Sequence, residues 1–149
     1  QSTAKAKQHY NSNRPFEVTG DPTCVPEDEK VLRGNASYPS GHASLGYVWG
    51  EVFAELLPES AGVARARAYE FGQSRVICRV HRQSDVDAGR TVGQAVVERL
   101  HQDPEFVADM AAAKSEVKNA RKHGPPAGRD CRAEATALRA TAPAQQQRQ

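Results

Sequence analysis

The residues best suited to chemistry lie in the stretch SRVICRVHRQSD, residues 74–85. Arg75 stands six residues before His81, and Asp85 follows four residues after the histidine. A carboxylate that accepts a hydrogen bond from one ring nitrogen of an imidazole fixes the ring tautomer and supports positive charge on the ring. A guanidinium adds a planar fork of donors that suits anions. Apolar residues lie between these polar ones, which indicates a polar site set into an apolar wall.

Two other stretches have the same polar character. The stretch KQHYNSNRP places Lys7 seven residues before Arg14, and YPSGH places Ser40, Gly41 and His42 at the start of an amphipathic segment. With the arginine of the first stretch, the chain offers three cations, and guanidinium and ammonium groups pair well with phosphoryl oxygens. The serine adds a hydroxyl donor, and the glycine lets backbone N–H groups at a helix start approach an anion. These residue types together favour a site for a phosphate ester.

The three stretches read, in chain order, K-x6-R-P, P-S-G-H and S-R-x5-H-x3-D. This pattern resembles the three-part signature of the type 2 phosphatidic acid phosphatase (PAP2) superfamily, which includes bacterial acid phosphatases and vanadium haloperoxidases. The surrounding segments NASYPSGHAS, GQSRVIC and QSDVDAGR look most similar to the class A non-specific acid phosphatases of bacteria. The resemblance runs from Lys7 to about Arg90 and weakens after that.

The resemblance implies a role for each residue of the pattern. His81 would be the nucleophile that forms a phosphohistidine, Asp85 would orient it, and His42 would protonate the leaving alkoxide and then activate water. Five residues would bind the phosphate: Lys7, Arg14, Ser40, Gly41 and Arg75. The expected function is hydrolysis of a broad range of small phosphate monoesters with no metal or other cofactor. Because His42 must begin protonated and His81 unprotonated, the activity should have a bell-shaped pH profile on the acid side.

Parts of the sequence pattern are also compatible with functions other than phosphate ester hydrolysis. A vanadium haloperoxidase would hold vanadate with the same residues, and halide oxidation would reveal it. A phosphate- or polyanion-binding module without turnover needs the cations but neither an acid nor a nucleophile, so His42 and His81 argue against it. A membrane lipid phosphatase is disfavoured because the expected helices are amphipathic and no apolar run could span a bilayer. A net charge of +2, with basic and acidic residues interleaved, argues against nucleic-acid binding.

The remaining sequence predicts an all-α fold, a helical bundle of the PAP2 acid phosphatase type. No alternation typical of strands occurs. We expect a polar helix at the start, which Pro15 ends, and then a long irregular segment over residues 14–41, with four prolines and three glycines. Within that segment Asn35-Ala36-Ser37 fits a glycosylation sequon, a match that is common by chance. Four further helices are expected, the third capped by Ser84; they cover residues 42–57, 59–78, 85–101 and 104–122.

The domain expected from the resemblance is incomplete. Residues 1–123 would form the C-terminal catalytic part of a PAP2-type domain, and residues 124–149 a partly disordered tail. Family members have further helices before the lysine motif, so the bundle would lack its N-terminal helices in this chain. Association with such a segment, or with a second copy of the chain, would cover exposed apolar faces. The class A relatives are periplasmic or secreted bacterial proteins, which implies the same location here.

Three cysteines lack the paired spacing of a zinc site. Cys78 lies among apolar neighbours and is most simply a packed small side chain. Cys24 and Cys131 lie in loop-like sequence and are the candidate pair for a disulfide in an oxidising compartment.

Overall fold

The computed structural model describes residues 2–124, 130, 132–133 and 135–136. These residues form helices, turns and irregular segments, with no strand among them, which confirms the all-α prediction. In chain order the helices are α1 (Ala4–Tyr10), α2 (Pro15–Thr19), η1 (Pro26–Asp28), α3 (Glu29–Leu32), α4 (Gly41–Leu56), η2 (Pro58–Ser60), α5 (Ala61–Ile77), α6 (Gln83–Leu100) and α7 (Pro104–His123).

The chain divides into two compact units, residues 1–112 and 113–149, and the boundary lies within α7. The site residues all belong to the first unit. Most of the tail predicted to be partly disordered lies outside the described residues. Over the described ranges, no helix combines the length and apolar character that a membrane crossing needs.

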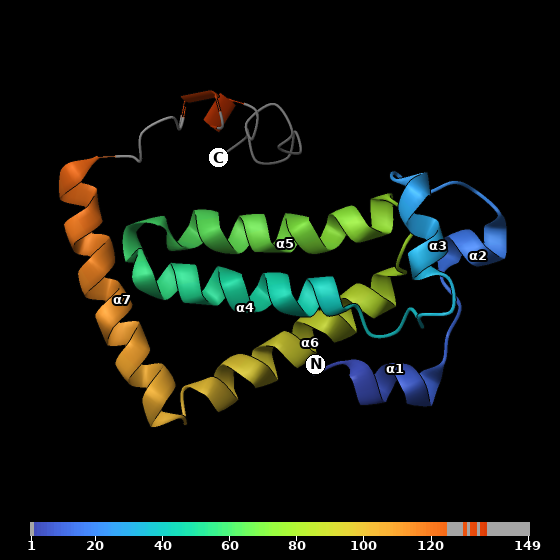
Figure 1. Cartoon of the computed structure of the whole chain (residues 1–149), viewed down its shortest axis with the longest axis horizontal. Coiled ribbons are helices and arrows are strands. Elements are labelled where there is room, and N and C mark those ends of the chain that lie inside the picture. The colour runs from blue at the N-terminus through green and yellow to red at the C-terminus, as the bar shows by residue number, and fades with distance from the viewer. Residues whose placement is uncertain (1, 125–129, 131, 134, 137–149) are drawn as a thin grey trace. The chain divides into compact units, whose positions relative to one another are not determined.

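Helix α4 is the element on which the first unit is built. It packs against α5 along one side and against α6 along another, and Figure 1 shows α5 returning antiparallel to α4 after the short η2 turn. Small residues allow the close α4–α5 approach: a Cβ added at Gly50 would lie 2.5 Å from the Cβ of Ala68. On the α6 side, Ala43 and Val86 are almost completely buried. Small side chains thus bring the backbones of three helices close together.

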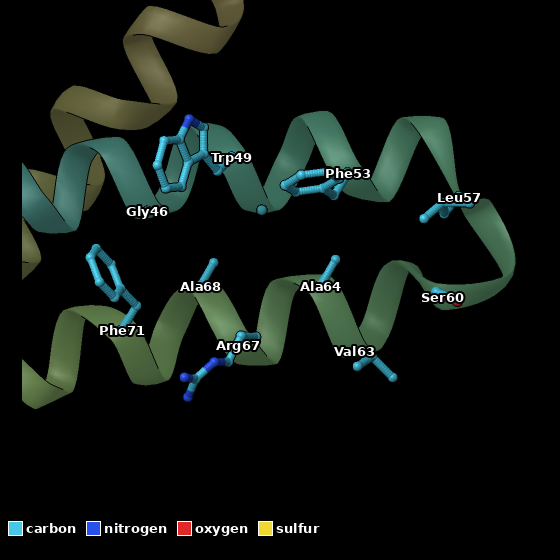
Figure 2. Close-up of a pocket in the computed structure, with 11 residues that line it drawn as sticks. Gly46, Trp49, Phe53, Leu57, Ser60, Val63, Ala64, Arg67, Ala68 and Phe71 are labelled. Carbon is cyan, nitrogen blue, oxygen red and sulfur yellow. The ribbon is translucent and has the colours of Figure 1, made fainter. Parts of the chain in front are cut away.

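An open apolar groove follows the α4–α5 pair. Figure 2 shows Ala64 and Ala68 pointing from α5 towards α4, with Trp49 and Phe53 on α4. Trp49 and Phe53 remain 55% and 52% exposed, respectively. We call this feature of about 440 Å³ the α4–α5 groove; it is lined by Gly46, Trp49, Gly50, Phe53, Leu57, Ser60, Val63, Ala64, Arg67, Ala68 and Phe71.

The segment that the sequence predicts to be irregular, residues 14–41, contains the short helices α2, η1 and α3. Pro15 does not end the first helix, which stops at Tyr10 with Asn11 in a left-handed conformation. It begins α2 instead, because the missing N–H of proline costs nothing at a first helical position. The prediction of one unbroken irregular segment was therefore wrong. Helices of three to five residues are too short to show a helical period.

The four longer helices lie where the sequence predicts them, with each end shifted by two residues or fewer. The predicted cap of the third was wrong, because α6 begins at Gln83 and Ser84 is inside it. The N–H of Arg82 donates to the carboxylate of Asp85 at 2.8 Å. The candidate catalytic carboxylate therefore also caps its own helix.

The predicted cysteine pairing was wrong as well. Cys24 is bonded to Cys78, with their Cα atoms 4.9 Å apart, and Cys131 lies outside the described residues. Helix α5 ends at Ile77, so Cys78 occupies the turn after the helix rather than a packed helical position. The disulfide ties the segment before η1 to the chain that leads to His81.

Candidate active site

The start of α4 is fixed against the start of α6 by backbone contacts. Ser40 caps α4, its Oγ accepting from the N–H of Ala43 at 3.2 Å. The N–H of Ser40 donates to the carbonyl oxygen of Asp85 at 2.8 Å. A Cβ at Gly89 would lie 2.4 Å from the Ser40 carbonyl oxygen, so this approach requires glycine. These contacts hold the P-S-G-H segment beside the first turn of α6.

A tight turn after α5 positions the candidate nucleophile. The N–H groups of Val80 and His81 both donate to the carbonyl oxygen of Arg75 at 3.1 Å. Arg79 makes the turn in a left-handed conformation, with φ of 59°. The His81 side chain is 2% exposed. The turn thus brings Arg75 and His81 together, as the sequence pattern predicts.

Asp85 lies on the Nδ1 side of His81. Its Oδ2 is 3.4 Å from His81 Nδ1 and accepts hydrogen bonds from Arg82 N–H at 2.8 Å and from Ser37 Oγ at 2.5 Å. Burial alone would raise the pKa of this carboxyl group. The hydrogen bonds from His81, Ser37 and the Arg82 backbone outweigh burial and lower the pKa to about 2. Asp85 is therefore an ionised, acceptor-only carboxylate at mildly acidic and neutral pH.

Arg14 lies on the opposite side of His81, and its side chain is buried. Its Nη1 donates to the Val80 carbonyl at 2.9 Å and lies 3.3 Å from His81 Nε2. Its Nε donates to the carbonyl oxygens of Asn35 and Leu32, at 3.0 and 3.3 Å. A guanidinium can only donate, so this contact favours an Nε2 that accepts. It favours the His81 tautomer with its proton on Nδ1 and a lone pair at Nε2.

Two further cations complete the site. Lys7 Nζ donates to the carbonyl oxygens of Ala36 and of Ser37, the latter at 3.2 Å. Its pKa falls to about 8, because of burial and then repulsion from Arg14, with partial compensation from Asp85. Burial also lowers the pKa of Arg75. Arg75 Nε is buried and has no hydrogen-bond partner in the described part of the chain. A buried donor without a partner is costly, and an anion oxygen would satisfy it.

The second predicted histidine, His42, lies in the first turn of α4 with an exposed side chain. It borders a pocket of about 480 Å³ on which five of the eight predicted residues converge: Lys7, Arg14, Gly41, His42 and His81. Partial burial lowers the pKa of His42, and repulsion from Arg75, Arg14 and Lys7 lowers it further. The other three predicted residues, Ser40, Arg75 and Asp85, do not line the pocket.

Burial lowers the pKa of His81 too. Arg14 and Lys7 add to this effect, whereas the hydrogen bond and charge of Asp85 oppose it. Both imidazoles are therefore easier to deprotonate than a free histidine. Within the described ranges, no group of three or more histidine, cysteine, aspartate or glutamate side chains is arranged to hold a metal ion.

One residue of the site was missed by the sequence pattern. Ser37 is fully buried and contacts both Asp85 and His81 Nδ1. The only local signal was its position three residues before Ser40, within SYPSGH. Nothing in that spacing shows that its hydroxyl reaches residues 44 and 48 positions away.

A helical fold with this set of histidines and cations defines a class of protein. The chain matches the PAP2 superfamily over residues 2–106, and it belongs to that superfamily. Among its relatives, the non-specific acid phosphatase of Salmonella typhimurium is 48% identical over 118 residues, which are 79% of this chain and 47% of the relative. The non-specific acid phosphatase of Providencia stuartii is 44% identical over 121 residues, 81% of this chain and 49% of the relative. The acid phosphatase of Zymomonas mobilis is 38% identical over 117 residues, 78% and 44% of the two chains.

The predicted similarity to bacterial non-specific acid phosphatases is thereby confirmed. The chain spans about half the length of the curated relatives it matches.

Proposed function

We propose that this protein is an acid phosphatase that hydrolyses small phosphate monoesters of a broad range through a phosphohistidine on His81. One observation carries the proposal: His81 lines the same pocket as Lys7 and Arg14, and its Nε2 lies 3.3 Å from Arg14 Nη1. The orphan N–H of Arg75 supports it, because an anion would satisfy that donor. Fixed cations that face developing negative charge are the main source of catalysis in phosphoryl transfer.

In the first step, His81 Nε2 attacks phosphorus, and the bond from phosphorus to the leaving oxygen breaks. Arg14 Nη1 now faces Nε2 at 3.3 Å, and a phosphoryl oxygen offers this N–H a stronger acceptor, which frees the lone pair for attack. His42 gives its proton to the leaving alkoxide. The positive charge that forms on the His81 ring is stabilised through Nδ1–H by Asp85.

In the second step, water attacks the phosphohistidine. His42, now neutral, takes the proton of the water, the bond from phosphorus to Nε2 breaks, and inorganic phosphate leaves. The resting enzyme is restored with His42 protonated. No step in this sequence calls on a metal ion, and we propose that the activity survives chelation. Because both histidines have a lowered pKa, the window in which one is protonated and the other neutral lies in acid.

We also propose a periplasmic or secreted location. The Cys24–Cys78 disulfide supports it, because such bonds persist in oxidising compartments. The partner in the reaction would be the small phosphate monoester. Association with an N-terminal segment or with a second copy of the chain stays a prediction.

The test is hydrolysis of a chromogenic aryl phosphate at mildly acidic pH with a chelator present. We expect His81→Ala to lower turnover by about 10⁴-fold or more, as removal of a nucleophile does. The matched control is His123→Ala, since His123 lies in the last turn of α7, where its Nδ1 bonds the Asn119 carbonyl of the same helix at 2.9 Å. An acid-labile, alkali-stable phosphoenzyme should be trapped in the parent protein and not in His81→Ala.

Other results would select a different function. Phosphate binding without turnover would identify a binding module, and halide oxidation after addition of vanadate and peroxide would identify a haloperoxidase. Hydrolysis that stops with chelator would overturn the metal-independent mechanism.

A further inference from the structure

We infer that Ser37 is a positioning residue for the nucleophile: its hydroxyl links His81 to Asp85 and fixes the His81 proton on Nδ1. The inference rests on the proposed role of His81 and adds a residue from outside the three-part sequence pattern. Ser37 does not line the pocket, so it would act through the imidazole rather than on the substrate.

The distances make Ser37, rather than Asp85, the nearer partner of the ring. Ser37 Oγ is 3.2 Å from His81 Nδ1, whereas Asp85 Oδ2 is 3.4 Å from the same nitrogen. The second separation is longer than most N–H···O hydrogen bonds in proteins. Ser37 Oγ is in turn 2.5 Å from Asp85 Oδ2, a length typical of a hydroxyl donating to a carboxylate. The carboxylate therefore reaches the imidazole mainly through the hydroxyl.

The number of protons on Ser37 and Asp85 determines which group donates in each of these hydrogen bonds. A serine hydroxyl has one proton, and Asp85, being ionised, can only accept, so Ser37 donates to Asp85. The Ser37 oxygen then has only lone pairs to offer His81. An Nδ1 without a proton would face those lone pairs, which is repulsive, so Nδ1 must carry the proton. Arg14 favours the same tautomer from the other side, through the longer 3.3 Å contact of its Nη1 with Nε2.

Ser37 is held in place on both sides of its own backbone. Its N–H donates to the Ser12 carbonyl at 2.8 Å, and the next N–H, of Tyr38, donates to Ser12 Oγ at 3.1 Å. Its carbonyl oxygen accepts from Lys7 Nζ at 3.2 Å. The same short segment thus positions the nucleophile through a side chain and a phosphate-binding cation through a carbonyl.

Removal of the hydroxyl should change the chemical step more than binding. Without the hydroxyl, Asp85 would still accept a hydrogen bond from the Arg82 N–H. On its Nδ1 side, the His81 ring would keep the 3.4 Å contact with Asp85 Oδ2. The charged groups that face the ring, Arg14, Lys7 and Asp85, would be unchanged. We expect Ser37→Ala to lower kcat about 10- to 100-fold, the usual cost of losing a group that orients a ligand or catalytic side chain. KM should stay within about threefold, because no substrate contact is lost.

The experiment combines kinetics on an aryl phosphate with long-range ¹H–¹⁵N spectra of the chain labelled at histidine. The parent protein should show His81 protonated on Nδ1. In Ser37→Ala, where Arg14 and Asp85 still favour that tautomer through their longer contacts, a detectable fraction of the Nε2–H tautomer should appear. Ser37→Thr keeps the hydroxyl and should recover most of kcat. Thr91→Ala is the matched control, since the Thr91 hydroxyl donates to the Asp87 carbonyl at 3.2 Å, within α6 and outside the three-part pattern.

Three results would overturn the inference: an Nε2–H tautomer in the parent protein, an unchanged kcat and tautomer in Ser37→Ala, or an equal loss in Thr91→Ala. The His81 tautomer in the spectrum of the parent protein tests the inference even if Ser37→Ala does not fold. The two proposals can also fail separately. If the protein has no turnover but its Nδ1–H tautomer depends on Ser37, the proposed phosphatase activity is wrong and the positioning role of Ser37 stands. If the protein turns over through phosphohistidine but His81 is protonated on Nε2, the phosphatase activity stands and the positioning role is wrong.

Discussion

The active-site end of α4 and the α4–α5 groove are organised in opposite ways. At the site, Arg14, His81 and Asp85 are buried, and each is held by several hydrogen bonds. Along the groove, Trp49 and Phe53 remain about half exposed. The hydrogen bonds of the site join the start of α4, the start of α6 and the loops. The groove meets the site at Phe71, a groove-lining residue whose ring centroid is 6.1 Å from that of His42. The buried polar side chains of the site are thus held by hydrogen bonds rather than by the apolar groove.

The largest effect is expected from removal of the Cys24–Cys78 disulfide, which lies at the active-site end of the first unit. The disulfide closes a loop over a sequence separation of 54 residues. In the chain-entropy account, loss of such a bridge lowers the free energy of unfolding by about 4 kcal/mol. We expect Cys24→Ser to cause a loss of this order in denaturant titrations.

Cys131→Ser is the control for that titration, because it leaves the Cys24–Cys78 bond intact. Equal losses from the two variants would show that the site end does not depend on this bridge. Peptide mapping under non-reducing conditions should recover Cys24 joined to Cys78.

The electrostatics of the site offer a second test. Repulsion from Arg75 is the largest of the charge effects that lower the pKa of His42. In the proposed mechanism His42 acts in its protonated form, so kcat/KM should fall as pH rises through the pKa of His42, which lies below its ordinary value. Arg75→Gln removes one positive charge, so the pKa of His42 should rise. The alkaline limb of the pH profile should therefore move to higher pH, while kcat/KM falls about 100-fold.

Arg67→Gln is the matched variant in the groove. Arg67 lies on the same helix, is exposed and pairs with Glu70 at 3.5 Å. Arg67→Gln should leave both the alkaline limb of the pH profile and kcat/KM unchanged. If the alkaline limb moves equally in the two variants, the pKa of His42 responds to net charge and not to the neighbouring guanidinium.

The smallest effect is expected in the groove itself. Because half of Phe53 is already exposed, Phe53→Ser should lower the free energy of unfolding by less than about 1 kcal/mol. Phe16→Ser is the counterpart at the site end. Because Phe16 is 1% exposed, this variant should lower the free energy of unfolding by about 3 kcal/mol or more. A large loss from Phe53→Ser would indicate that the groove is covered in solution.

Two kinds of signal made parts of the molecule predictable. The long helices follow from apolar periods, and one turn between α5 and α6 keeps Arg75, His81 and Asp85 close in the chain. The convergence of Lys7, Arg14 and His42 with His81 at one pocket was predicted from the resemblance to the PAP2 superfamily and not from spacing. The cysteine pair and Ser37 depend instead on where the segment of residues 14–41 folds back. That segment is ordered by single hydrogen bonds and short helices, such as α2 and α3, which leave no periodic signal.

Asp85, Gly89 and Gly93 recur every fourth residue along α6, on the stripe that meets α4. A Cβ at Gly93 would lie 2.8 Å from the Ser44 carbonyl oxygen. The candidate catalytic carboxylate, Asp85, and the glycines that pack against α4 therefore lie on the same face of α6. A deletion of one residue between Asp85 and Gly89 would turn the rest of the helix by about 100° relative to the site. Point substitutions on the outer face of α6 should accumulate freely during evolution, whereas insertions and deletions in its first two turns should be eliminated.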